Sequence, residues 1–89
     1  MYASIKKLDL TDFRLVIAVR DYPFMNAFGA RVRELRLKRN WSQEQLGHRA
    51  QITLSQVARI EHGKTNPTIC TVKVLATALE MPVGELMTF

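Results

Sequence analysis

Residues 41–63 read WSQEQLGHRAQITLSQVARIEHG, and this stretch decides the fold. Its apolar residues recur at helical spacing in two short segments, 42–50 and 53–62, with only a few residues between them. Gly63 stops the second segment, because glycine adopts the left-handed backbone conformation at little cost. Two short helices that cross at a steep angle over such a turn form a helix-turn-helix arrangement.

Both helices carry local start signals. Ser42, with Gln45 three residues later, matches a capping box, in which the serine accepts from a free backbone N–H and the glutamine reciprocates. Thr53 is suited to cap the second helix. Val57 and Ile60 lie three residues apart, so we expect them to face the interior.

A further helix is predicted before this pair, at residues 26–39. Phe28, Val32 and Leu35 fall on one helical face, and Asn26 is suited to cap the helix. Trp41, which follows the helix, is expected to belong to the core.

Two more helices are predicted after the pair. Pro67 is expected to open a helix that runs to Glu80, because proline is favoured in a first helical turn. The apolar period of this helix comprises Ile69, Val72, Leu75, Ala76 and Leu79. Pro82 starts a last helix of one turn. The predicted fold class is therefore all-α, with five short helices from residue 26 onward.

The stretch from Phe28 to Leu86 resembles the phage-repressor-like, Xre-type helix-turn-helix family. The matching segments are GARVRELR at 29–36, WSQEQL at 41–46, SQVARIEHGK at 55–64, NPT at 66–68 and VLATAL at 74–79. They occur in the family's order and at its spacing. The resemblance implies a repressor-like DNA-binding domain over residues 26–89.

Two residues depart from the family pattern. Gly47 stands where the family usually has alanine, and glycine costs about 1 kcal/mol relative to alanine inside a helix. Gln51 stands where the turn usually has glycine, at a position that is expected to require a positive φ. We therefore expect a somewhat less stable motif than a consensus version.

The resemblance places helix 53–62 in the major groove, with its N-terminal residues near base edges. Leu54, Ser55 and Arg59 are the positions that it assigns to bases. Arg59 can pair with a guanine, although a phosphate contact or a surface salt bridge remains an alternative. Leu54 touches a thymine methyl or has a packing role, and Gln56 reaches a base or a phosphate.

Other residues are expected to contact the DNA backbone. Ser42 and Gln43 open a helix whose N-terminus favours an anion, and Ser42 also serves as a cap. The remaining candidates for phosphate contacts are Thr53, His62, Lys64, Thr65 and Asn66. For residues 64–66 the alternative is an ordinary polar loop.

Arg36 and Glu61 have a different expected role. The family pairs an arginine on its first helix with a glutamate at the end of the recognition helix. We therefore expect these two residues to form a structural salt bridge that orients helix 53–62, and we assign no catalytic role to Glu61.

The remaining reactive side chains predict no enzyme and no cofactor. With two histidines, one cysteine and no close carboxylate cluster, the sequence contains no recognisable metal site. Cys70 lies among apolar positions, which predicts an inert core thiol. No constellation of catalytic residues is apparent.

The charge distribution favours a polyanionic partner. The 89 residues suit one domain and carry a net charge of +5. Residues 25–64 hold eight basic and three acidic side chains, so the excess lies in the middle of the chain. The longest apolar run, 15–19, is too short to span a membrane, and the start lacks a signal-peptide pattern. A single cysteine also favours a cytoplasmic chain.

Residues 1–25 lie outside the resemblance. Apolar residues alternate along 13–20, a period that indicates a strand, and the segment before it is suited to pair as a hairpin. Such an extension would pack on the helical domain or pair with a second subunit. Alternatively, Met25 is the biological start, and the preceding residues form a disordered or artificial extension.

Together these features predict a small transcriptional regulator that binds operator DNA. A homodimer on a palindromic site is expected, since two-fold symmetry doubles the contacts of a small module. The alternative is an antitoxin-type protein-interaction module, which would bind a toxin or another protein as well as DNA.

Overall fold

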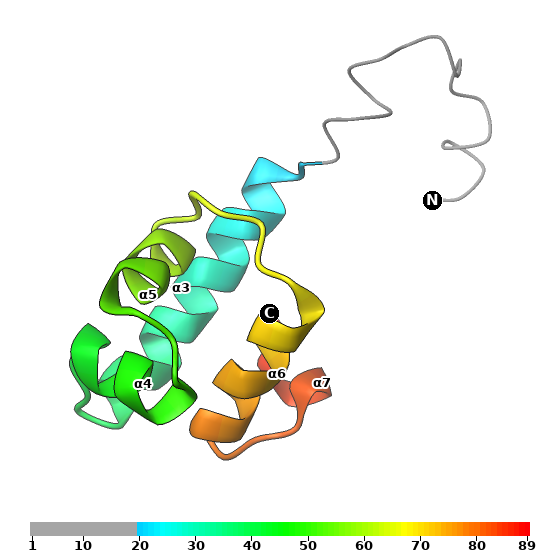
Figure 1. Ribbon diagram of the computed structural model, residues 1–89. Coiled ribbons are helices and arrows are strands. Elements are labelled where there is room, and N and C mark those ends of the chain that lie inside the picture. Colours follow the sequence, from blue (N-terminus) through cyan, green and yellow to red (C-terminus); the bar gives the residue numbers. More distant parts are fainter. Residues whose placement is uncertain (1–19) are drawn as a thin grey trace, which may run out of the picture.

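The computed structural model describes residues 20–89, and all of the following concerns that part of the chain. It contains five α-helices (Figure 1): α3 (Tyr22–Lys38), α4 (Gln43–Ala50), α5 (Leu54–Glu61), α6 (Ile69–Ala78) and α7 (Val83–Leu86). No strand occurs in this range. The predicted all-α class and the five-helix organisation are confirmed.

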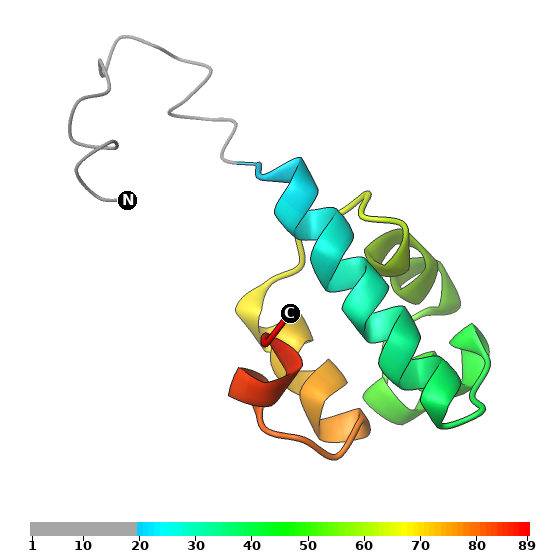
Figure 2. The ribbon, with the colours of Figure 1, turned by 180° about the vertical axis from the view of Figure 1, so that it is seen from behind.

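The long helix α3 lies behind the others. Seen from that side, α3 crosses the molecule between the α4–α5 pair and the α6–α7 pair (Figure 2). One apolar core joins all five helices, and its largest fully buried side chains are Val32, Leu46, Val57, Leu75, Leu79 and Leu86. α5 packs against α3 and α4, which leaves its other side toward solvent.

The start of α3 differs from the sequence prediction. The helix begins at Tyr22 instead of residue 26, and Asp21 caps it by accepting a hydrogen bond from the Phe24 N–H at 3.0 Å. Pro23 lies in the first turn, where its missing N–H costs nothing. Asn26 is therefore an interior residue of the helix, and the prediction that it forms the cap is wrong.

The α4–α5 pair has the predicted caps and turn. The side chains of Ser42 and Thr53 each accept from the backbone N–H three residues later, and both capping boxes are complete. Gln51 has a φ of 57°, as expected for that position. A Cβ on Gly47 would lie only 2.9 Å from the carbonyl oxygen of Ile52. Glycine there lets the turn pass close to α4.

The start of α6 corrects three predictions. Thr68 caps this helix, with the Thr71 N–H donating to its Oγ1 at 3.1 Å, so Pro67 precedes the helix instead of opening it. Ile69 is 87% exposed, because the residues of α6 that pack against the core begin at Val72. Cys70 is exposed as well and is not a core thiol. The half-buried Trp41, by contrast, packs against the core cluster.

The predicted strand at 13–20 and its hairpin partner fall almost entirely within residues 1–19, which lie outside the described part. Among residues 20–89, no helix has the length and apolarity that crossing a membrane requires. The same range holds no group of three potential metal ligands.

Candidate nucleic-acid interface

α5 presents one buried and one open face. Val57, Ile60 and Glu61 are buried against the rest of the domain. The exposed side chains on the helix and its flanking residues are Thr53, Leu54, Ser55, Gln56, Arg59 and His62. Leu54 is half exposed at the first position of the helix. The residues that the resemblance assigns to bases therefore share an uncovered surface.

The start of α5 is fixed by a reciprocal pair of hydrogen bonds. The Gln56 N–H donates to Oγ1 of Thr53 at 3.0 Å, and the Thr53 N–H donates to Oε1 of Gln56 at 2.9 Å. Both residues therefore help to begin the helix, and the Nε2 of Gln56 is the part of its amide left for another acceptor. This capping box also fixes the backbone conformation of Leu54 and Ser55, which lie between the two residues.

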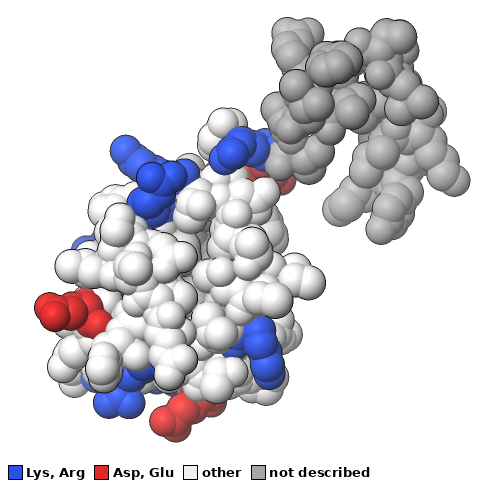
Figure 3. Space-filling model, viewed as in Figure 1, with Lys and Arg blue, Asp and Glu red and all other residues white. Residues whose placement is uncertain are grey.

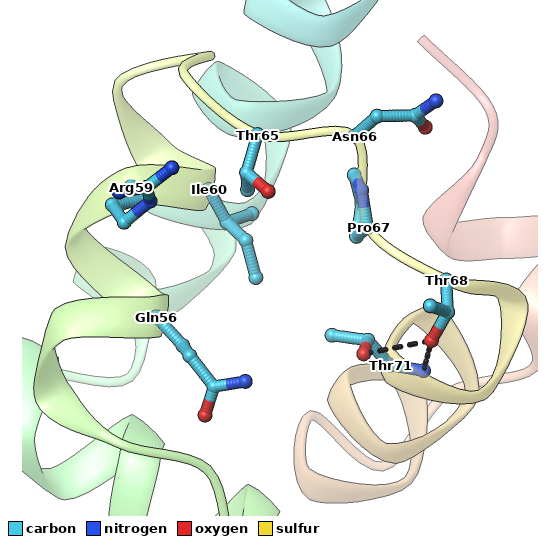
Figure 4. Close-up of a pocket in the computed structure, with 8 residues that line it drawn as sticks. All are labelled: Gln56, Arg59, Ile60, Thr65, Asn66, Pro67, Thr68 and Thr71. Atoms are coloured by element: carbon cyan, nitrogen blue, oxygen red, sulfur yellow. Dashed lines mark hydrogen bonds between the residues drawn. The ribbon is translucent and has the colours of Figure 1, made fainter.

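A shallow pocket of about 160 Å³ separates α5 from the start of α6. Figure 4 shows Gln56 directed from α5 toward α6, and Thr65 above it on the loop. The hydroxyls of Thr68 and Thr71 lie 3.0 Å apart on the opposite side. The pocket thus has polar side chains from both helices and from the loop between them, a composition that suits contacts with a nucleic-acid backbone.

The loop that follows α5 turns back along the helix. Gly63 has a φ of 68°, and the Lys64 N–H donates to the Arg59 carbonyl at 2.9 Å. Nδ1 of His62 lies 2.8 Å from the carbonyl oxygen of Ala58, which can only accept, so Nδ1 carries the hydrogen. The side chain of Lys64 is exposed. Lys and Arg side chains gather over this end of the face seen in Figure 3.

The start of α4 adjoins the end of α5. Ser42 uses its hydroxyl as the helix cap, accepting from the Gln45 N–H at 3.0 Å. Half-buried Gln43 donates from Nε2 to Oε1 of Glu61 at 3.1 Å. The two predicted backbone-contact residues of α4 are therefore held beside α5, with the N-terminus of α4 open to solvent.

Arg36 and Glu61 form a buried bidentate pair. Nε of Arg36 lies 2.7 Å from Oε2 of Glu61, and Nη2 lies 3.0 Å from Oε1. Nη1 also donates to the Trp41 carbonyl at 2.6 Å. The hydrogen bond with Glu61 raises the pKa of Arg36 above its usual value, with burial acting against it. Arg36 thereby ties α3 to α5 and to Trp41, the residue before the Ser42 cap of α4.

Sequence reasoning missed a cation–π stack on the ring of Trp41, which precedes α4. The guanidinium of exposed Arg49 lies 4.3 Å from the ring centroid of Trp41, and that of Arg39 lies 5.8 Å from it. Arg39 also donates to the carbonyls of Leu35 and Leu79. Arg49 lies eight residues after Trp41, and the two side chains meet only because α4 folds between them. The sequence spacing alone was therefore a weak signal for this contact.

The comparisons with known proteins agree with this geometry. A family model described as helix-turn-helix matches residues 32–86, which is more than half of the chain. The chain belongs to the helix-turn-helix family, in its phage-repressor-like, Xre-type form. This membership assigns it to a class of DNA-binding regulators and not to a class of enzymes.

One curated relative of this family member is a Bacillus subtilis (strain 168) protein named HTH-type transcriptional repressor RghR, which is 38% identical over 64 residues. That alignment covers 71% of this chain and 47% of the relative. The related B. subtilis regulator RghRB gives 38% identity with 46% of its length covered. This helix-turn-helix chain thus spans about half the length of the curated relatives that it matches.

Solved structures support the same fold. The restriction-modification controller protein C.AhdI from Aeromonas hydrophila is 37% identical, with a TM-score of 0.70. The match covers 73% of this chain and 94% of the controller. The clp gene regulator ClgR from Corynebacterium glutamicum has a TM-score of 0.67 at 17% identity, a likeness that concerns the fold alone.

Proposed function

We propose that this helix-turn-helix protein binds double-stranded DNA sequence-specifically, with α5 in the major groove, and regulates transcription. The observation that carries the proposal is the uncovered face of α5, on which Leu54, Ser55 and Arg59 are exposed while the opposite face is buried. A major groove admits one α-helix, whose outward side chains then reach the base edges. Arg59 is the residue that pairs with guanine.

Backbone contacts flank this helix on two sides. The N-terminus of α4, with Ser42 and Gln43, binds one phosphate through its free N–H groups and its dipole. Thr53, His62, Lys64, Thr65 and Asn66 bind the other strand's backbone around the α5–α6 loop. The Arg36–Glu61 pair and the Gln43–Glu61 hydrogen bond fix the angle between these elements.

The protein acts as a homodimer on a palindromic operator. One domain of this size reads few base pairs, and two copies related by two-fold symmetry read half-sites roughly 34 Å apart. The name of the B. subtilis relative as a repressor and that of C.AhdI as a controller favour a regulatory role. We place the protein in the cytoplasm, where a bacterial regulator meets its DNA.

Selection of bound duplexes from a random pool tests the proposal, followed by fluorescence anisotropy on the selected site. We expect an enriched palindromic sequence and an affinity that falls steeply with salt, because phosphate contacts release counterions. Sedimentation of the complex is expected to give two chains per duplex. Failure to enrich any sequence at low ionic strength would contradict specific DNA binding.

A further inference from the structure

An apolar groove lies at the N-terminal end of α3, on a surface that the DNA-binding proposal does not use. Its volume is about 190 Å³. The apolar walls come from Phe24, Met25 and Phe28 of α3, Ile69 and Val72 of α6, and Met87 after α7. Three separate helical segments therefore meet to form a concavity without charged side chains in its lining.

Large apolar side chains stand uncovered at the rim of this groove. Ile69 is 87% exposed, Phe24 is 49% exposed, and Phe89 is 50% exposed. The rings of Phe24 and Phe89 pack with their centroids 5.4 Å apart, which gathers these exposed surfaces into one patch. A contiguous apolar patch of this kind, next to a groove, marks a binding surface for another apolar segment.

The chain itself supplies such a segment beside the groove. The residues before the described part end at Val19, two positions before the Asp21 cap, and Phe24 lies in the first turn of α3. Residues 13–19 read FRLVIAV, in which Arg14 is the single charged residue. Seven extended residues span roughly 23–25 Å, which is enough to cross a surface formed by the ends of two helices.

We propose that residues 13–19 fold back into this groove of the same chain. The apolar side chains of the segment then cover Ile69, Phe24 and Phe89 and fill the space above Met87. Asn66 and Pro67 line both this groove and the pocket beside α5. The occupied groove therefore also supports the loop that follows the recognition helix.

Hydroxyl-radical footprinting of the full chain without DNA tests this placement, with Phe24, Met87 and Phe89 as the reporting side chains. A Leu15→Asp/Ile17→Asp variant disrupts the segment, and Ile5→Asp is its matched control outside residues 13–19. Ile69→Asp disrupts the groove. Ile69 is exposed at the first position of α6, where an acid is compatible with the helix dipole, so the fold is retained.

We expect the reporters to be protected in the intact chain and in Ile5→Asp, and to lose that protection in both of the other variants. The protection should be independent of protein concentration, with a monomer mass under dilute conditions. Equal reactivity in all four proteins would overturn the proposal. Protection that appears only as dimers form in sedimentation would also overturn it, because a second copy would then fill the groove. Neither result bears on DNA binding, which this experiment does not involve.

Discussion

Nε2 of Gln43 donates a hydrogen bond to Oε1 of Glu61 across a distance of 3.1 Å. Gln43 is the first residue of α4, and Glu61 is the last residue of α5. The same carboxylate receives Nε and Nη2 of Arg36 from α3. A single buried carboxylate thereby sets the start of α4 against the end of α5, and so fixes the relative position of the two helices that we expect to face the DNA.

Replacing Gln43 by leucine removes a donor to this buried carboxylate. We expect the free energy of unfolding to fall by about 1.5–3 kcal/mol, because hydrogen bonds to charged groups contribute that much. Urea denaturation followed by circular dichroism measures the change. Ser55→Ala, which alters an exposed side chain of α5 outside this network, is the control and should unfold almost like the intact chain. A Gln43→Leu variant with the same free energy of unfolding as the intact chain would show that the hydrogen bond does not stabilise the fold.

Breaking the Arg36–Glu61 pair is expected to cost more. Arg36→Met leaves the carboxylate of Glu61 buried without its cation, which lowers the free energy of unfolding by about 3–5 kcal/mol. Glu34→Gln is a matched control, because the pairs of Glu34 with Arg31 and Lys38 lie at the surface and contribute at most about 1 kcal/mol. Equal losses in the two variants would contradict the structural role of the buried pair.

The pH dependence of this pair follows from the raised pKa of Arg36. A cation whose pKa is higher in the folded state contributes its full stabilisation below the unfolded-state pKa, and loses it only as the pH rises through the folded-state pKa. That range is strongly alkaline for an arginine. The stability difference between the intact chain and Arg36→Met should therefore stay constant from about pH 7 to pH 10. A difference that shrinks over this range would be inconsistent with an ionised Arg36.

Gly29 is required by the crossing of α3 and α5. A Cβ at this position would lie 2.2 Å from the carbonyl oxygen of Ile60 and 2.8 Å from that of Glu61. Gly29→Ala should therefore destabilise the domain by about 1–3 kcal/mol through overpacking, despite the better helix propensity of alanine. Gly84→Ala, with nothing within 4 Å of its added Cβ, should be neutral or stabilising in the same thermal denaturation assay. Equal melting temperatures for the two variants would refute the close approach.

Lys64 is expected to contact phosphate without reading sequence. Lys64→Ala should weaken binding evenly across selected and unselected duplexes, and should reduce the slope of log affinity against log salt by about one unit. Lys73→Ala, which removes another exposed lysine, on α6, controls for the loss of net charge. A change of base preference in Lys64→Ala would contradict its assignment to the backbone.

Local sequence signals predicted much of the fold. The capping boxes of α4 and α5 involve residues three positions apart, and the positive φ of Gln51 follows from its place in the turn. The site residues of α5 followed from the family resemblance, and their exposure agrees with the expected open face. Such features depend on near neighbours in the chain, which a sequence pattern records.

The wrong predictions concern two kinds of position. At some, several residues could begin the helix, and at others the outcome depends on segments that are distant in the sequence. Asp21 and Asn26 are both good caps, and the burial of Met25 in α3 favours the earlier start. At the start of α6, the cap is Thr68 and not Pro67, because the hydroxyl of Thr68 accepts a hydrogen bond from the backbone N–H of Thr71. The exposure of Ile69 and the Gln43–Glu61 bond depend on tertiary packing, which periodicity does not encode.

The most direct test of the central claim is dimethyl sulfate footprinting on the selected operator, with the intact chain and with Arg59→Ala. The reagent methylates guanine N7 in the major groove and adenine N3 in the minor groove. We expect the intact chain to protect one or more guanine N7 atoms in each half-site, and Arg59→Ala to lose protection at one of them. Protection confined to adenine N3, or none at any guanine, would contradict the placement of α5 in the major groove.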